Sequence, residues 1–109
     1  MHELAITDGV VQLVRERLGD QRVARVRLEI GRLTAVEPEA MRFCFDVCTR
    51  GTSLDGAALE IDEVAARVRC ARCGGEREVP DGIPICACGS ADVEIVAGNE
   101  LRIKEVEVT

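Results

Sequence analysis

Residues 22–31 read RVARVRLEIG and alternate between apolar and charged side chains. In an extended chain successive side chains point to opposite faces, so the apolar members face one side and the charged members the other. The apolar members are Val26, Leu28 and Ile30, and the charged members are Arg25, Arg27 and Glu29. The stretch therefore predicts a half-buried β-strand on which other elements can pack.

Amphipathic helices are predicted on both sides of this strand. Before it, apolar positions recur at steps of three and four, and Gly19 is a stop signal. These positions are Leu4, Thr7, Val10, Val11, Leu13, Val14 and Leu18. After it, Pro38 suits the first turn of a second helix that ends before Gly51. The expected apolar face of this second helix contains Met41, Cys44, Phe45 and Cys48.

Two later strands are predicted, and each changes the parity of its apolar positions. Residues 58–70 read ALEIDEVAARVRC, with odd apolar positions at first and even ones later. Residues 100–109 read ELRIKEVEVT and show the same change. A bulge or a passage into another domain re-aims side chains in this way. Between the two strands lies a glycine-rich insert with four cysteines, from about Ala65 to Gly98.

These elements predict an α+β fold with two parts. Two helices on a small three-stranded sheet form one domain, from residues 1–64 plus 99–109. The insert, residues 65–98, forms a zinc-ribbon-like domain.

The insert carries two short cysteine motifs, CARCGG at residues 70–75 and CACGS at 86–90. Four thiolates from two such knuckles can surround Zn²⁺ tetrahedrally, and the following glycines let backbone amides face the sulfurs. Apolar residues are too sparse to hold the insert together, so we expect the metal to supply folding free energy. A thioredoxin-like dithiol at Cys70 and Cys73 is the redox alternative. The second knuckle is C-x-C, one residue shorter than the usual C-x-x-C, and this spacing constrains the angle between Cys86 and Cys88.

Cys44 and Cys48 are four residues apart on the expected second helix. They could form a second metal pair. Free cysteine is also a common buried apolar residue, and we favour core packing for both.

Composition limits the function classes. The chain has 109 residues, with 20 Asp and Glu against 14 Lys and Arg, for a formal charge of −6. This charge opposes nucleic-acid binding, which draws on the neutralisation of phosphates by basic side chains. We find no long apolar run and no secretory signal, and therefore expect a cytoplasmic protein without a membrane span. Six cysteines in such a chain point to metal or redox chemistry.

The chain begins MHELAIT, and His2 is its only histidine. The α-amine of Met1, the backbone nitrogen of His2 and its imidazole can close two fused chelate rings on one metal. Glu3 can fill a fourth position through its carboxylate or its backbone nitrogen. Such a nitrogen-rich planar set favours Ni(II) or Cu(II) over Zn(II). An ordinary solvated terminal histidine is the alternative.

Taken together, these motifs resemble the HypA/HybF family of nickel metallochaperones, which act in the maturation of nickel–iron (NiFe) hydrogenases. MHELAIT is similar to the family's nickel motif, VRLEIGRL to its first strand and FCFDV to its second helix. The cysteine insert resembles its zinc lobe, and ELRIKEVEV its closing strand. The second knuckle departs from the usual C-x-x-C of the family.

The resemblance implies that Met1, His2 and Glu3 bind nickel, and that Cys70, Cys73, Cys86 and Cys88 bind structural zinc. It further implies a carrier without catalytic residues. The implied partners are a nickel-handling GTPase of the HypB type and the hydrogenase large subunit, and either a monomer or a homodimer is compatible with the sequence. A zinc-ribbon module that binds protein or nucleic acid is the alternative function, and a redox enzyme at Cys70 and Cys73 is a third.

Overall fold

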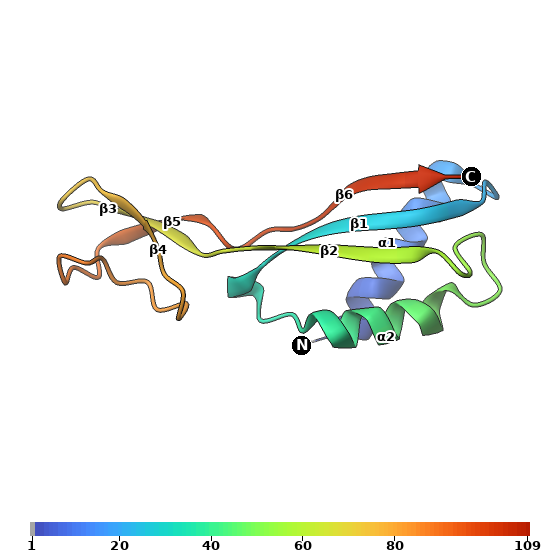
Figure 1. Cartoon of the computed structure of the whole chain (residues 1–109), viewed down its shortest axis with the longest axis horizontal. Helices are drawn as coiled ribbons and strands as arrows, with labels where there is room; N and C mark the ends of the chain where they lie inside the picture. The colour runs from blue at the N-terminus through green and yellow to red at the C-terminus, as the bar shows by residue number, and fades with distance from the viewer. Residues whose placement is uncertain (1) are drawn as a thin grey trace. The chain divides into compact units, whose positions relative to one another are not determined.

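The computed structural model describes residues 2–109 and has a mixed α+β architecture, as predicted (Figure 1). Its strands form two three-stranded sheets, with the orders β2-β1-β6 and β4-β3-β5. The elements are α1 (Glu3–Leu18), β1 (Val23–Gly31), the 3₁₀ turn η1 (Arg32–Thr34), α2 (Pro38–Thr49), β2 (Ala58–Val64), β3 (Arg67–Cys70), β4 (Glu76–Glu78), β5 (Val93–Ala97) and β6 (Leu101–Val108). Within residues 2–109, no helix combines the length and the apolar character needed to cross a bilayer.

The chain divides into two compact units. The first contains the chain up to Glu29 together with Val36–Asp62 and Arg102–Thr109. The second contains Ile30–Ala35 and Glu63–Leu101.

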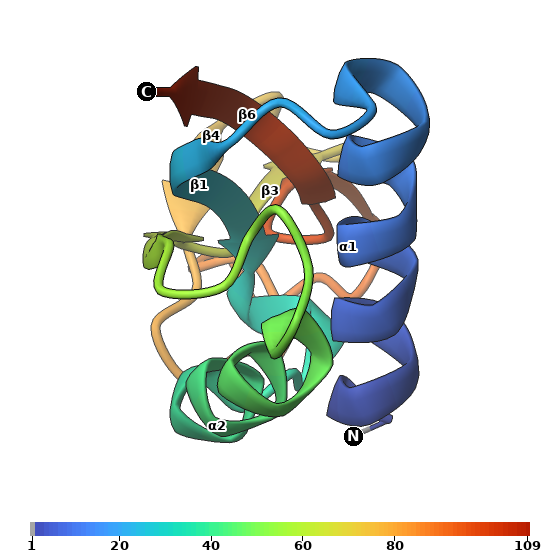
Figure 2. The same cartoon turned by 90° about the vertical axis from the view of Figure 1, so that its right-hand side faces the viewer.

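Strand β1 is the central strand of the first sheet, and the predicted alternation is confirmed. Val26 and Leu28 are buried, with relative exposures of 0% and 1%, whereas Arg25, Arg27 and Glu29 are only half-buried. Figure 2 shows α1 and α2 on one side of this sheet. The apolar side of β1 therefore supplies the core of the first unit, and the charged side faces away from the helices.

Ion pairs on the charged side show how β2 runs beside β1. Arg25 pairs with Glu60 at 3.1 Å, and Arg27 pairs with Asp62 at 2.9 Å. Residue numbers rise together along the two strands, so β1 and β2 are parallel.

Strand β6 runs in the opposite direction. Arg25 pairs with Glu107 at 3.0 Å, while Glu29 at the other end of β1 pairs with Arg102 at 2.7 Å. Residue numbers fall along β6 as they rise along β1, so these two strands are antiparallel.

The first helix begins at Glu3, one residue before Leu4, the first apolar position of the predicted face. It ends at Leu18, and the predicted stop signal Gly19 is its C-cap, with the Gly19 N–H donating to Arg15 O at 2.8 Å. Thr7 and Val11 are buried, as is Val14. The predicted apolar face was too wide, because Leu4 is 57% exposed and Leu13 is 44% exposed. Leu13 precedes the buried Val14 by one residue, which places it about 100° around the helix. Leu4 lies in the first turn, at the end of the helix.

Helix α2 begins as the sequence predicts. Pro38 occupies its first turn, and the carboxylate of Glu37 accepts the Glu39 N–H at 3.3 Å as an N-cap. Met41 and Phe45 are buried in the core of the first unit. The hydrogen-bonded start and the buried face together fix α2 in the first unit.

The second unit has a small core. The predicted long strand 58–70 is broken at Ala65 and Ala66, where the parity of its side chains changes, into β2 and β3. Ala66, Val68 and Val79 are buried together, and Leu33 and Val93 pack against them. Strand β3 pairs antiparallel with β4 and with β5, and a bulge interrupts the pairing with β5. The contribution of Leu33, which precedes the insert by more than thirty residues, was not predicted.

Two glycines allow a close backbone approach in the second unit. The Gly31 N–H donates to Glu100 O at 2.8 Å, and the Leu33 N–H donates to Gly98 O at 2.7 Å. A Cβ on Gly31 would lie 2.0 Å from Gly98 O, and Gly98 itself has φ +108° and lies against Ala66. Only glycine fits these two positions without a shift of the backbone.

We therefore predict that Gly31→Ala lowers the free energy of unfolding by about 1–3 kcal/mol, because its methyl group would overlap the Gly98 carbonyl. Gly9→Ala is the matched control: Gly9 lies in α1 with open space around its Cβ position, so this change should stabilise by about 0.5–1 kcal/mol. Urea unfolding of both variants measures the difference. Equal stability of the two would contradict the close approach.

Candidate metal centre

The first knuckle is a tight turn at the end of β3. The Cys70 N–H donates to Gly75 O at 2.9 Å, and the Gly74 N–H donates to Cys70 O at 2.9 Å. Gly74 has φ +72°, a backbone conformation that residues other than glycine rarely adopt. The turn thus brings Cys73 back toward Cys70.

The second knuckle repeats this hydrogen-bond pattern in one residue fewer. The Cys86 N–H donates to Ser90 O at 2.9 Å, and the Gly89 N–H donates to Cys86 O at 2.9 Å. Gly89 has φ +88°. The shortened C-x-C spacing therefore still folds as a knuckle that presents the Cys86 and Cys88 sulfurs to one place.

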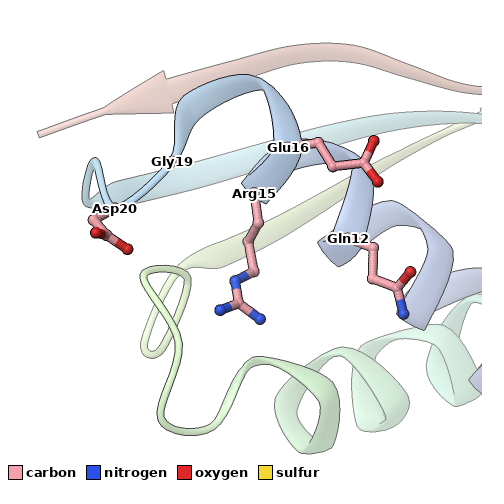
Figure 3. Close-up of a pocket in the computed structure, with 5 residues that line it drawn as sticks. All are labelled: Gln12, Arg15, Glu16, Gly19 and Asp20. Carbon is pink, nitrogen blue, oxygen red and sulfur yellow. The ribbon is translucent and has the colours of Figure 1, made fainter.

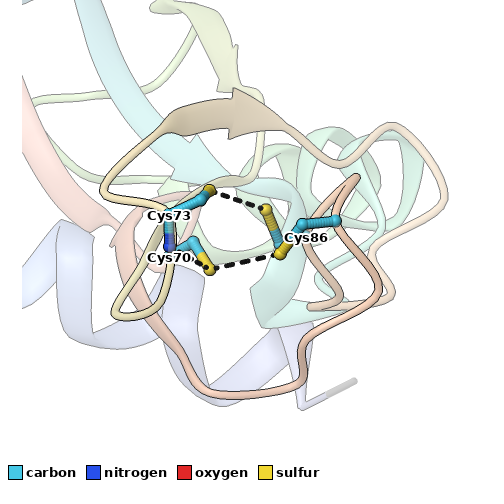
Figure 4. A group of neighbouring side chains, drawn as sticks. Cys70, Cys73 and Cys86 are labelled. Carbon is cyan, nitrogen blue, oxygen red and sulfur yellow. Dashed lines mark hydrogen bonds between the residues drawn. The ribbon is translucent and has the colours of Figure 1, made fainter.

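The four cysteine sulfurs meet in one cluster, with all of them within 4.8 Å of one another. The Sγ atoms of Cys73 and Cys86 are 3.5 Å apart, and those of Cys70 and Cys88 are 3.7 Å apart. Three members are labelled in Figure 4. In a tetrahedral Zn–S site with bonds of about 2.3 Å, sulfurs are separated by about 3.8 Å. The donor set thus fits a tetrahedral metal ion held by four sulfurs.

Backbone amides of the knuckles donate to the cysteine sulfurs, as expected from the glycines that follow each cysteine pair. The Cys73 N–H points at Cys70 Sγ over 3.5 Å. This amide, and then that of Arg72, lowers the pKa of the Cys70 thiol to about 6 against the opposing effect of burial. The knuckle therefore favours a thiolate, the form that binds metal, at Cys70.

The thiols of Cys88 and Cys73 have raised pKa values, the opposite of Cys70. The Ser90 N–H lowers the pKa of the Cys88 thiol, but hydrogen bonds with Cys86 and Cys70 outweigh it and raise that pKa to about 11. For Cys73 the Gly75 N–H acts in the same lowering direction, and Cys86 and Cys70 again raise the pKa above its usual value. Without a cation, negative charge concentrates on Cys70, and protons remain on Cys73 and Cys88.

The cluster is exposed on one side. Cys70 and Cys86 are buried, with relative exposures of 1% and 7%, whereas Cys73 and Cys88 are exposed. All four predicted zinc ligands are thus together, and Cys70 and Cys73 do not form an isolated dithiol.

The predicted nickel ligands belong to the first unit. Met1 lies outside the described residues. His2 is exposed, has φ 56° and ψ 30°, and makes no side-chain hydrogen bond that caps α1. The Glu3 carboxylate accepts the Glu37 N–H at 3.0 Å, which ties the first turn of α1 to the start of α2.

Cys44 and Cys48 are half-buried on α2. The Cys48 sulfur lies 3.7 Å from the hydroxyl oxygen of Thr7 on α1. Thr7 is fully buried. Neither cysteine belongs to a group of three or more ligand-forming His, Cys, Asp or Glu side chains in the part of the chain that the structure describes.

A shallow pocket of about 300 Å³ lies at the C-terminal end of α1. Its lining residues are Gln12, Arg15, Glu16, Gly19 and Asp20 (Figure 3). It contains none of the predicted ligands, and its charges are mixed in sign.

An α+β unit joined to a small sheet with a four-cysteine cluster defines a small metal-binding protein. The profile of the family described as "Hydrogenase/urease nickel incorporation, metallochaperone, hypA" matches residues 1–108. Hydrogenase maturation factor HypA of Nostoc punctiforme is 49% identical over 108 residues, which cover 99% of this chain and 96% of the relative. That of Geobacter metallireducens is 47% identical over 109 residues, covering 99% of each chain. The chain belongs to the HypA family of nickel metallochaperones.

The fold is also similar to a solved structure. The solution structure of the nickel metallochaperone HypA from Helicobacter pylori matches with a TM-score of 0.66 and 21% identity, over 97% of this chain and 96% of that one. The family thus has the fold predicted here, and its described role is nickel incorporation in hydrogenase maturation.

We predict that Cys73→Ser loses most of the bound metal and makes the insert sensitive to protease, because three sulfurs cannot complete the cage. Cys44→Ser is the matched control, since Cys44 lies on α2 outside the cluster. Metal analysis and limited proteolysis of both variants measure this. Unchanged metal content in Cys73→Ser would contradict the assignment.

Metal affinity of the cluster should also depend on pH in two stages. Above pH 6 binding displaces protons from Cys73 and Cys88, whose pKa values are raised, so affinity falls as pH falls. Below about pH 6 Cys70 is protonated as well, because its pKa is about 6. One more proton is then displaced for each metal bound, so below about pH 6 the logarithm of the affinity should fall by about one further unit per pH unit. Competition with a chromophoric chelator measures this slope, and a constant slope from pH 5 to 8 would oppose the expectation.

Proposed function

We propose that this chain carries Ni(II) at its N-terminus and delivers it to the large subunit of a NiFe hydrogenase. The nickel is cargo, and the chain is a carrier without catalytic residues. Membership of a nickel-incorporation family supports this function. The observation that carries the assignment of the site is that His2, the only imidazole of the chain, is exposed at the N-cap of α1 and that its side chain makes no capping hydrogen bond.

The proposed donors are the α-amine of Met1, the backbone nitrogen and imidazole of His2, and Glu3. The Glu3 carboxylate accepts the Glu37 N–H at 3.0 Å. Either this carboxylate or the Glu3 backbone nitrogen would fill the fourth position on the metal. An exposed terminal site allows ligands to be exchanged one at a time with an acceptor. This exchange suits a carrier, which must release its metal.

We infer that Cys70, Cys73, Cys86 and Cys88 hold a structural Zn(II). Four protein ligands leave no open position for catalysis, and the sulfur separations suit a tetrahedral ion. In functional terms residues 1–64 plus 99–109 form the nickel-binding domain, and residues 65–98 form the zinc-binding domain. Soft sulfur and hard nitrogen donors would thus be separated along the chain.

The proposed partners are a HypB-type GTPase that handles nickel and the hydrogenase large subunit, and the proposed location is the cytoplasm. A nucleic-acid-binding zinc ribbon is the weaker alternative. Arg69, close to the first knuckle, pairs with Glu76 at 3.1 Å and Glu94 at 3.8 Å. Its charge is therefore neutralised within the second unit, which disfavours a phosphate contact.

Nickel titration tests the terminal site. The untagged protein should bind one Ni(II), while His2→Ala and a variant with one glycine added before Met1 should each bind at least about tenfold more weakly. Each change breaks a chelate ring, the first by removing the imidazole and the second by moving the α-amine. Calorimetry and absorption spectroscopy give the affinities.

Cys73→Ser is the control, because it alters the sulfur cluster and should leave the nickel affinity unchanged. Transfer to a purified metal-free large subunit then tests delivery. Equal nickel binding by the untagged, His2→Ala and glycine-extended proteins would refute the terminal site.

A further inference from the structure

Strand β6 forms one edge of the first sheet. The order β2-β1-β6 leaves the side of β6 that faces away from β1 without a strand neighbour among residues 2–109. Figure 1 shows this strand along the border of the sheet, with the C-terminus at its end. An unpaired edge of eight residues is a template for the addition of another strand.

The charged side chains of β6 lie on one face. Arg102 and Lys104 pair with Glu29, at 2.7 and 3.7 Å. Glu105 and Glu107 both pair with Arg25 on the same face of β1, at 3.6 and 3.0 Å. Lys104 and Glu105 are consecutive in sequence yet face the same way, so the parity change predicted from the sequence falls between them.

The apolar side chains of β6 lie on the other face by the same alternation. Ile103 and Val106 are half-buried, while Leu101 and Val108 are 47% and 38% exposed. The strand therefore reads apolar, basic, apolar, basic in its first half and acidic, apolar, acidic, apolar in its second half.

We propose that β6 is a self-complementary edge that binds β6 of a second copy of this chain, antiparallel and about a two-fold axis between Lys104 and Glu105. Every residue of the strand then faces a suitable partner on the same face. The opposed pairs are Leu101 with Val108, Arg102 with Glu107, Ile103 with Val106, and Lys104 with Glu105 of the second copy. The two sheets join into one of six strands, in the order β2-β1-β6-β6-β1-β2.

Charge complementarity selects this register. A shift of one residue would place Lys104 opposite Lys104, or Glu105 opposite Glu105, and like charges directly opposed are destabilising. A shift of two residues would place Lys104 opposite Ile103, or Glu105 opposite Val106. The arrangement also keeps the intramolecular ion pairs, because each charge already faces β1 and gains a second neighbour across the new ladder. An isologous contact of this kind closes as a dimer and does not continue into a fibre.

Leu101 and Val108 allow a test that spares those ion pairs, because both are exposed and uncharged. Leu101→Lys or Val108→Glu alone places a charge opposite an apolar side chain of the second copy. We expect each to raise the dissociation constant of the dimer about tenfold or more. The double variant L101K/V108E places Lys opposite Glu and should bring the constant back toward that of the wild type. Sedimentation over micromolar to millimolar concentrations measures it.

Ala58→Glu is the matched control, because Ala58 is exposed on β2 at the other edge of the same sheet, and this change should leave association unaltered. Circular dichroism checks that each variant is folded. On the wild type, β6 amides should exchange hydrogen more slowly as protein concentration rises. A monomer at every concentration would overturn the proposal. So would a dimer that Ala58→Glu weakens and the β6 variants do not, or a double variant weaker than both single ones.

Discussion

The inserted unit depends on the mutual placement of four cysteine sulfurs. Its buried apolar cluster consists of Ala66, Val68 and Val79, which is too little apolar surface to order about forty residues. Two backbone knuckles bring the sulfurs to within 4.8 Å of one another. Without a cation the raised pKa values of Cys73 and Cys88 keep protons on these thiols, and a bound cation would replace those protons. We therefore expect metal binding and folding of this unit to be coupled. The first unit has its own apolar core around β1 and does not share this dependence.

This division gives the proposed carrier a physical basis for sorting its metals. Thiolates fixed by backbone turns suit a tetrahedral, tightly held ion, whereas an amine, an imidazole and a carboxylate at a chain end suit an ion that must leave. The hydrogen bond from Glu37 to the Glu3 carboxylate places one proposed donor at the start of α2. If Glu3 binds nickel as proposed, the metal would contact the same carboxylate that joins the first turn of α1 to the start of α2.

Local patterns predicted the helices and strands of the first unit, whereas β4, β5 and contacts distant in sequence were missed. The alternation of Val26 and Leu28 with charged residues and the glycines after each cysteine pair act within a few residues, so the sequence alone specifies them. The parity change in residues 58–70 also marked the break between β2 and β3. Leu33 and the approach of Gly31 to Gly98 were not predicted, because they join segments more than thirty residues apart. Leu4 and Leu13 were assigned to the core on hydrophobicity, yet their positions on α1 leave them exposed.

The two metal sites proposed for this chain differ in their donor atoms, with sulfur in one and nitrogen and oxygen in the other. X-ray absorption spectroscopy at the nickel and zinc edges of one sample loaded with both metals tests this difference most directly. Zinc should be surrounded by four sulfurs at about 2.3 Å, and nickel should have only nitrogen and oxygen neighbours. Sulfur in the nickel shell, or nitrogen in place of sulfur around zinc, would contradict it.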